Sequence, residues 1–250
     1  MQTTALSRLY DLYLSEALTE LTYDAALAGL SYSFGITQRG VVLSLSGFND
    51  KLPAFIDAVA AAVVAYVPKD EAKLAKFKDV LARNFNAFTF QQPYLHAAAY
   101  ARQCEMKPAS LPTDSLDDID NISLAELQAW VKGLWTKGFG QALIQGNFRE
   151  EEALACAQKV VDAFALQPLA EVERGAPKFF QLPVTREGYG NVLVRQEPNK
   201  ENGNSAVLVQ FQNGAREDLR QQLAMEVTPT AYPVRRKNLL HTPCALGARP

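Results

Sequence analysis

Two short segments near the start of the chain alternate between apolar and polar positions. In residues 30–37 every second side chain is a large apolar one, and residues 41–46 repeat the pattern. A period of two is typical of a β-strand with one buried face. Residues 38–40, which end in glycine, predict a turn between the two strands, so the pattern indicates a β-hairpin.

On either side of the hairpin the apolar positions recur at every third or fourth residue, which is the spacing of one helix face. We expect one helix before the hairpin, beginning almost at Met1, a second that ends before Pro68, and a third that Pro93 kinks or ends. The predicted buried faces of these helices and of the segment after Pro93 consist of Tyr10, Leu14, Leu18, Leu21 and Ala25; Leu52, Phe55, Ile56, Val59 and Val63; Leu74, Phe77, Leu81, Phe85 and Phe88; and Tyr94, Ala97, Ala98 and Ala101.

Capping residues locate two later helices. Ser123 and Glu126 form a capping box, and Ile122 and Leu127 occupy the apolar positions that flank such a box. Residues 149–165 form the other helix, with three glutamates in its first turn, where the helix dipole favours negative charge.

The remaining segments are predicted to be loops, short strands and one further helix. Strands are expected at residues 139–145, 178–182, 191–196 and 205–212, a loop at 107–121 and a helix at 215–227. The predicted fold class is α+β, with an antiparallel sheet packed against several helices, followed by an incomplete second domain of the same kind. We expect the first domain at residues 1–165, a linker at 166–188, the start of the second domain at 189–227 and a divergent, disordered tail at 228–250.

Composition places the chain among ordinary globular proteins. It has 250 residues, of which 48% are hydrophobic and 21% charged, and its formal net charge is -2. With no basic excess, nothing favours a nucleic-acid partner. The longest apolar run, residues 58–67, is too short to span a bilayer, so no membrane partner is expected.

The three cysteines, Cys104, Cys156 and Cys244, are widely spaced and odd in number. That spacing argues against a disulfide framework and against a zinc site made of cysteines alone. We interpret them as small thiols in a reducing compartment, and we expect a cytoplasmic location.

The hairpin region also resembles a known family. Residues 23–32, YDAALAGLSY, and residues 45–53, LSGFNDKLP, are similar to the middle domain of the insulinase (insulysin/pitrilysin) family of zinc metallopeptidases. Further similarity lies in QPYLH at residues 92–96 and ALIQGNF at residues 142–148. The resemblance implies a metalloendopeptidase that degrades peptides, in which an N-terminal half carries zinc and a C-terminal half closes over it to form a chamber.

The zinc motif of that family, H-x-x-E-H, is absent. The chain has two histidines, His96 and His241, which are too far apart to form it. We therefore predict no catalytic, cofactor-binding or metal-binding residue in this chain, and we expect zinc only in the N-terminal domain of the parent family. His96 is interpreted as a helix-packing or surface residue, and His241 as a solvated residue of the tail.

Three other groups have two interpretations each. One group consists of four carboxylates that could bind a calcium ion, those of Asp114, Asp117, Asp118 and Asp120. The spacing lacks the glycine and terminal glutamate of an EF-hand, so we favour a solvated loop. A second group is a lysine-rich helix face that could bind anions, although we favour a solvated surface. Its members are Lys69, Lys73, Lys76 and Lys78. Trp130 and Trp135 are five residues apart, and packing in a core or interface is the simpler interpretation.

These observations leave three hypotheses for function. The first is a non-catalytic C-terminal-half portion of an insulinase-type peptidase, which forms part of the peptide-enclosing chamber and has the catalytic half and peptides as its partners. The second is a free-standing inactive homologue that acts as a partner subunit of a catalytic half. The third is a fragment with no independent role, which the abrupt helical start and the unpatterned tail both suggest.

Overall fold

A computed structural model of the chain describes residues 2–37, 40–107, 109–174, 178–179, 191–210 and 223. They belong to two compact units, one comprising Met1–Asn86 with Pro112–Pro177 and the other Ala87–Leu111 with Lys178–Pro250. Most of the predicted turn at 38–40, nearly all of the helix at 215–227, and the tail at 228–250 with His241 and Cys244 lie outside the described residues.

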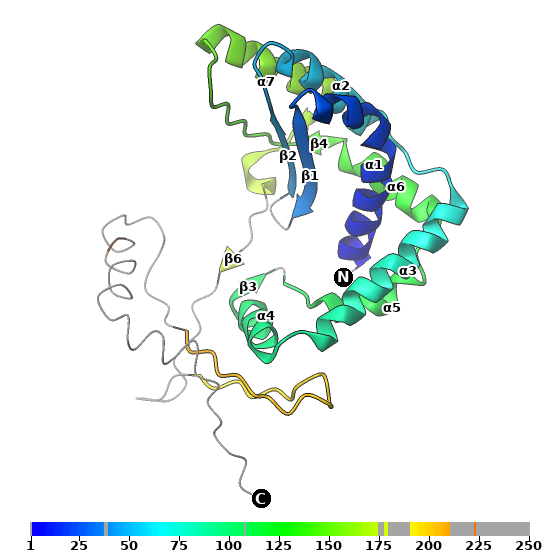
Figure 1. The fold of residues 1–250 in the computed structure, drawn as a ribbon, viewed down its shortest axis with the longest axis vertical. Helices are drawn as coiled ribbons and strands as arrows, with labels where there is room; N and C mark the ends of the chain where they lie inside the picture. Colours follow the sequence, from blue (N-terminus) through cyan, green and yellow to red (C-terminus); the bar gives the residue numbers. More distant parts are fainter. Residues whose placement is uncertain are drawn as a thin grey trace, which may run out of the picture. The chain divides into compact units, whose positions relative to one another are not determined.

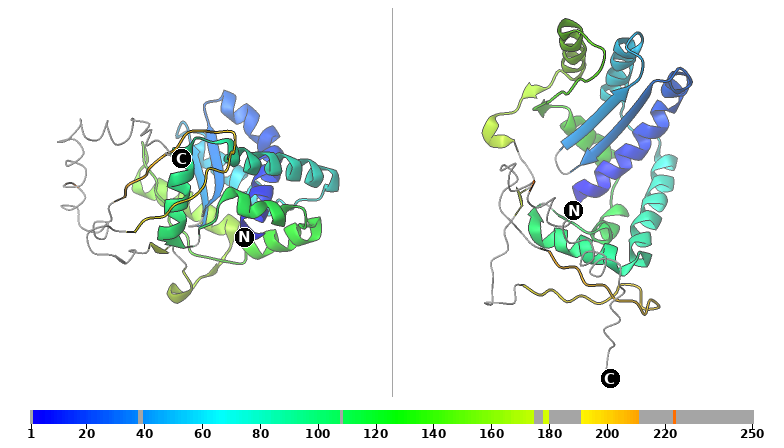
Figure 2. Two further views of the ribbon diagram at one scale, coloured as in Figure 1. Left: turned by 90° about the horizontal axis from the view of Figure 1, so that it is seen from below. Right: turned by 60° about the vertical axis from the view of Figure 1, so that its left-hand side comes forward.

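The first unit is built on the predicted hairpin and the helix that precedes it. Helix α1 spans Gln2–Leu27, and strands β1, Ser31–Thr37, and β2, Gly40–Ser46, pair antiparallel. The register places Tyr32 opposite Leu45 and Phe34 opposite Leu43, so the apolar side chains share one face. That face packs against α1, and the predicted hairpin is confirmed (Figures 1 and 2).

Two further helices complete the N-terminal half of this unit. Helix α2, Leu52–Ala65, buries all five apolar residues predicted for it, and helix α3, Glu71–Ala87, buries four, including Leu74 and Phe77. In α1 the buried residues run from Ala5 to Leu18; of the rest of the predicted stripe, Leu21 is 40% exposed and Ala25 is partly buried against the core. The Tyr10 hydroxyl donates a hydrogen bond to the Val63 carbonyl at 3.1 Å, which joins α1 to α2 inside the core.

The C-terminal half of the unit adds helices α6, Leu124–Leu134, and α7, Glu150–Phe164. The Ser123 hydroxyl accepts a hydrogen bond from the Glu126 N–H at 3.2 Å, as the capping box predicts. Ile122 and Leu127 are both buried, and α7 packs against α2. The predicted loop at 107–121 contains two short helical turns, η2 at Pro112–Ser115 and α5 at Leu116–Ile119, and Ile119 is fully buried in the core.

The strand predicted over residues 139–145 is wrong. The described residues there form no ladder, and pairing is confined to β4, Lys137–Gly138, with β5, Gln167–Pro168, in parallel. Leu143 is 90% exposed, so this segment has neither a strand partner nor a buried face in the described part of the chain. The η3 turn, Glu171–Glu173, ends the unit, and the Arg174 guanidinium lies 3.8 Å above the Phe139 ring.

The second unit contains η1, Phe88–Phe90, α4, Pro93–Glu105, and the strand pair of β3, Met106–Lys107, with β6, Lys178–Phe179. The third predicted helix, α3, ends at Ala87, and Pro93 stands at the first position of a separate helix, α4. The predicted buried face of α4 is wrong, since Pro93 and His96 are buried and Tyr94 is 62% exposed.

The strand predicted at 178–182 is present at its first two residues, and residues 180–182 lie outside the described part. Residues 191–196 and 205–210 are not strands in the structure, because no ladder pairs them within the described part of the chain. The combination of helices with a small antiparallel sheet confirms the α+β class. The predicted domain division stays a prediction.

Candidate functional site

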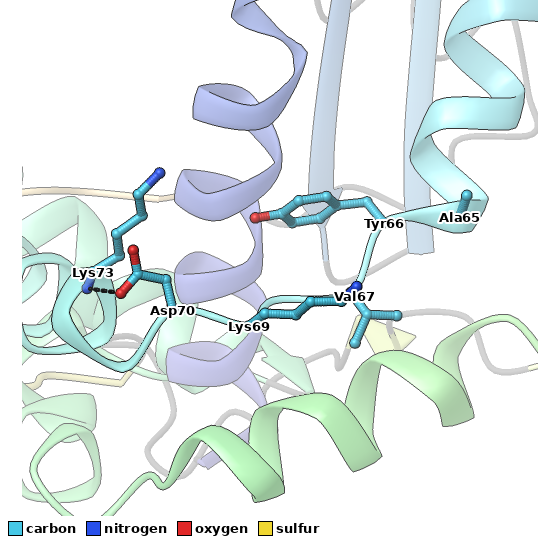
Figure 3. A pocket seen from close by; sticks show the side chains of 6 residues that line it. All are labelled: Ala65, Tyr66, Val67, Lys69, Asp70 and Lys73. Atoms are coloured by element: carbon cyan, nitrogen blue, oxygen red, sulfur yellow. Dashed lines mark hydrogen bonds between the residues drawn. The ribbon is translucent and has the colours of Figure 1, made fainter.

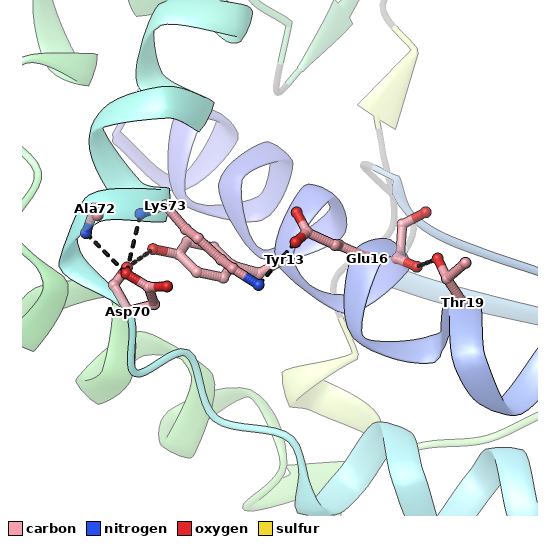
Figure 4. Close-up of polar contacts among 7 residues, drawn as sticks. Tyr13, Glu16, Thr19, Asp70, Ala72 and Lys73 are labelled. Atoms are coloured by element: carbon pink, nitrogen blue, oxygen red, sulfur yellow. Dashed lines mark hydrogen bonds and ion pairs between the residues drawn. The ribbon is translucent and has the colours of Figure 1, made fainter.

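A polar cluster joins α1 to the start of α3, and we call it the Asp70 junction. It consists of Tyr13, Glu16, Tyr66, Asp70 and Lys73 (Figures 3 and 4). Two helices and the connection between α2 and α3 contribute to it, so residues more than 50 positions apart in the chain meet there.

Asp70 is the N-terminal cap of α3. Its Oδ1 accepts hydrogen bonds from the Ala72 N–H at 2.9 Å and the Lys73 N–H at 3.2 Å, two of the donors that a helix start leaves without partners (Figure 4). Its backbone carbonyl accepts from the Tyr13 hydroxyl at 2.5 Å and from the Leu74 N–H at 3.2 Å. The Asp70 side chain therefore caps α3, and its backbone carbonyl joins the beginning of α3 to α1.

An ion pair lies beside the cap. Lys73 Nζ is 2.7 Å from Glu16 Oε1, and both side chains are nearly half exposed. The hydrogen bond from Lys73 lowers the pKa of the Glu16 carboxyl, and the same bond raises the pKa of Lys73. Because water screens an exposed pair, it contributes little to stability and chiefly orients the two side chains.

The tyrosines of the junction are held in their neutral form. Burial raises the pKa of Tyr13 to about 12, and the nearby Asp70 carboxylate adds to the effect. Burial also raises the pKa of Tyr66. A phenol with a raised pKa is a weaker acid, so neither tyrosine is prepared to act as a base or nucleophile near neutral pH.

A shallow cavity of about 250 Å³ lies at this junction (Figure 3). Its lining includes Tyr66, Lys69, Asp70 and Lys73. The Asp70 carboxylate is occupied in capping and the Lys73 ammonium in its ion pair, so these two groups already have partners within the protein. The arrangement fits a structural junction and contains no pairing of a nucleophile with a base.

A second cavity, of about 360 Å³, lies between the start of α2 and α7. Its lining includes Pro53, Phe148, Cys156 and Lys159. Lys159 forms an ion pair with Asp57, and the Cys156 thiol is only 3% exposed. A buried thiol beside apolar side chains behaves as a small hydrophobic group, so this cavity also shows no catalytic pairing.

The histidine and cysteine residues considered above as possible ligands lie in different settings. His96 is buried in the second unit, and Cys104 is exposed on the same helix, α4. No group of three or more histidine, cysteine, aspartate or glutamate residues within the described ranges is arranged to hold a metal ion. The residues that can be described therefore do not fit the zinc site of the family that the sequence resembles.

The lysine and tryptophan groups have structural roles. Lys73 pairs with Glu16, and Lys78 donates to the Asp120 carbonyl at 3.0 Å. Trp130 packs edge-on against Tyr10, with 6.1 Å between the ring centroids, and Trp135 packs against Phe164 at 5.0 Å.

Among the helices of the described residues, none combines the length and the apolar character needed to cross a bilayer.

Sequence reasoning missed the role of Asp70. The signal was local, because an aspartate directly after Pro68 and Lys69 precedes the apolar periodicity of α3 and is a preferred N-cap residue. The contact with Tyr13 has no such signal, since 57 residues separate the two.

Comparison with known proteins gives the same family as the hairpin motifs. Residues 1–117 match the family model described as the middle or third domain of peptidase M16. Human insulin-degrading enzyme is 29% identical over 208 residues, which cover 82% of this chain and 20% of the relative. A nardilysin-like protein of Arabidopsis thaliana is 27% identical over 207 residues, covering 83% of this chain and 20% of that protein.

The fold comparison agrees. The crystal structure of pitrilysin matches with a TM-score of 0.61 at 20% identity, over 66% of this chain and 17% of the other. The chain thus contains an α+β domain whose fold is similar to that of pitrilysin, and its residues 1–117 are similar to the middle domain of the insulinase/pitrilysin family, M16. It spans about a fifth of the length of the curated relatives that it matches.

Proposed function

We propose that this chain forms part of the wall of a peptide-enclosing chamber in an insulinase/pitrilysin-type metalloendopeptidase and contributes no catalytic group to it. The observation that carries the proposal is the match of residues 1–117 to the M16 middle domain. The name of a relative from Schizosaccharomyces pombe, 27% identical over 216 residues, includes the words zinc protease. Zinc and the residues that bind it would then come from a catalytic half that pairs with this chain.

Exposed apolar side chains in the first unit support a role that involves further contacts. Tyr23, Leu27 and Phe48 are each more than 60% exposed, and they lie on the end of α1 and in the connection after the hairpin. Large apolar side chains grouped on a surface are common at protein and peptide interfaces. They lie within the region that matches the family model, where a wall of the chamber would need to contact either the catalytic half or the peptide.

The proposal is tested in the cells that produce the protein. An antibody against residues 21–50 would precipitate the native polypeptide, whose mass and chelator-sensitive cleavage of a quenched fluorescent peptide are then measured. We expect cleavage in the precipitate, together with an H-x-x-E-H sequence. A band several times larger than 27.5 kDa would place that sequence in the same polypeptide, and a 27.5 kDa band with a co-precipitated peptidase would indicate a partner subunit.

The non-catalytic role has its own control. The purified 250-residue chain, incubated with zinc and the same peptide, is expected to show no chelator-sensitive cleavage. Such cleavage by a pure sample would overturn the statement that the chain lacks a catalytic group. A precipitate with neither peptidase activity nor an H-x-x-E-H polypeptide would overturn the chamber proposal as a whole.

A further inference from the structure

The cavity between the start of α2 and α7 has an apolar interior and an acidic rim, and we call it the α2–α7 pocket. Its interior contains the buried Cys156 and the half-buried Pro53 and Phe148, and its rim carries the exposed carboxylates of Asp50 and Glu152. Its volume of about 360 Å³ lies at the small end of the roughly 300–1,000 Å³ that ligand pockets occupy. The pocket therefore has room for one side chain or a ligand of similar size.

Two segments that are distant in the sequence form the walls of the pocket. Helices α2 and α7 pack side by side (Figure 1), and the Asn49 side-chain amide donates a hydrogen bond to the Asn147 carbonyl at 3.4 Å. Phe148, next to Asn147, packs against the hydrophobic core. These contacts position both walls, so the shape of the pocket is set by the fold itself.

The positive charge in the lining is already compensated. It belongs to Lys159, which forms an ion pair with Asp57, a residue of α2 outside the lining. On the rim, Asp50 has a cationic neighbour in Lys51 at 3.4 Å, but their side chains are 80% and 74% exposed, so water screens this pair. The Asp50 carboxylate can therefore exchange Lys51 for another cation.

Glu152 is held in place by a hydrogen bond that does not neutralise it. One of its carboxyl oxygens accepts from the Arg149 N–H at 2.9 Å, in the capping box of α7. A backbone donor carries no net charge, and Glu150 and Glu151 add negative charge in the same turn. The helix dipole offsets part of it, since it places only about half an elementary charge at the N-terminus. The rim therefore favours a cation.

We infer that the α2–α7 pocket binds a lysine or arginine side chain of a protein partner. The aliphatic stem of that side chain would lie against Phe148 and Cys156, and its charged head would reach the carboxylates of Asp50 and Glu152. The inference concerns the shape and charge of this pocket and does not depend on the chamber proposal.

The surface around the pocket indicates that the side chain comes from a protein. Phe48, which immediately precedes the lining residue Asn49, is 73% exposed. Leu154, next to the lining residue Ala155, is 62% exposed. Protein interfaces combine such apolar contacts with arginine anchors that fill pockets, whereas a free small amine would leave both apolar side chains in water.

Cys156 reports on the pocket because its thiol lines it. The purified 250-residue chain is labelled with two methanethiosulfonate reagents, one carrying a trimethylammonium group and the other a sulfonate, and mass spectrometry gives the rate at each cysteine. Cys104, exposed on α4 in the other unit, provides the intrinsic ratio of the two reagents. We expect the cation-to-anion rate ratio at Cys156 to exceed that at Cys104 about fivefold at low salt and to approach it at about 1 M salt, because carboxylates attract the cation and repel the anion.

Variants of the rim assign this preference to the pocket. Asp50→Asn with Glu152→Gln removes both charges, and glutamine can retain the capping bond, so the two cysteines should then give nearly equal ratios. Glu151→Gln is the matched control, because it removes a charge from the same turn of α7 without lining the pocket. Equal ratios at the two cysteines of the wild type, or a Glu151→Gln effect as large as that of Glu152→Gln alone, would overturn the cation preference.

Protection of Cys156 tests the ligand. Its alkylation by iodoacetamide, a neutral reagent, is measured with acetyl-Leu-Arg-Leu-amide, the citrulline analogue of this peptide, or agmatine at equal concentrations. We expect the arginine peptide to slow the reaction about threefold and the other two to have little effect. Equal protection by the citrulline peptide would overturn the recognition of charge, and equal protection by agmatine would indicate a small-amine site and overturn the protein partner.

The native protein distinguishes a docked partner from a passing peptide. It is captured from its source cells with an antibody against residues 191–210, which lie in the other unit, and washed before Cys156 is labelled. We expect slower labelling than in the purified chain, and restoration of the rate at about 1 M salt. Washing removes loosely bound peptides, so an unchanged rate would overturn a docked partner, and protection that persists at high salt would overturn a contact based on charge.

Discussion

Replacing Gly47 with alanine tests how closely the end of the hairpin packs against its beginning. Gly47 follows β2 and has a φ of +148°, a backbone conformation that side chains rarely adopt. A Cβ atom placed there would lie 2.4 Å from Leu30 Cδ2, 3.0 Å from the Gly29 carbonyl oxygen and 3.0 Å from Leu30 Cα. The first contact could be relieved by rotating a side chain, but the other two involve the backbone and could not.

The magnitude follows from two costs. Strained backbone conformations of this kind cost of the order of 1–3 kcal/mol, and forcing extra volume into a packed site costs a further 1–3 kcal/mol. We expect Gly47→Ala to lower the free energy of unfolding by about 2–6 kcal/mol. Gly40→Ala is the matched control, because φ is +124° but no atom lies within 4 Å of the new Cβ, so only the first cost applies.

Urea unfolding followed by the fluorescence of Trp130 and Trp135 measures both variants, since these tryptophans pack in the same unit as the hairpin. Gly35→Ala, in the middle of β1 with open space around it, provides a third variant that we expect to be neutral or slightly stabilising. Equal losses for Gly47→Ala and Gly40→Ala would refute the packing argument, because the close contacts would then contribute nothing.

Three other predictions concern the core, the Asp70 junction and the cysteines. Burial raises the pKa of Tyr10 to about 12, so its neutral form stabilises the fold below pH 10, and about 3 kcal/mol is lost as the pH rises from 10 to 12. Tyr10→Phe removes the hydrogen bond to Val63 at every pH, so its urea midpoint should differ from that of the wild type by a constant amount below pH 10 and by a changing amount between pH 10 and 12. Asp70→Ala should cost about 1 kcal/mol through loss of the α3 cap while Asp70→Asn retains most of it, and equal losses in thermal unfolding would contradict the capping role. Cys104 should react with a thiol reagent in the native chain much faster than Cys156, which is 3% exposed, and the order is read by mass spectrometry of the labelled peptides.

Much of the local structure could be predicted because it depends on neighbouring residues. The hairpin follows from its period of two, and the α6 cap follows from Ser123 and Glu126, which are three positions apart. The hairpin also carries the motifs of the M16 middle domain; the fold class is confirmed, and the family model matches residues 1–117, which include those motifs.

The errors occurred where local pattern was not sufficient. Residues 139–145 have strand-like composition, but a strand exists only when another segment supplies hydrogen bonds, and none of the described residues does so. On α4, alanine spacing suggested the wrong buried face, because His96 is buried through its contacts with Phe88 and Glu197.

The sequence alone determined the longer helices, the cap of α6 and the hairpin, because each depends on side chains within a few positions of one another. The tertiary structure decided which polar groups meet. Tyr13 reaches the Asp70 carbonyl across 57 residues, and His96 reaches Glu197 across 101. These contacts depend on how separate segments pack, and at Tyr13 burial then raises the pKa of the phenol.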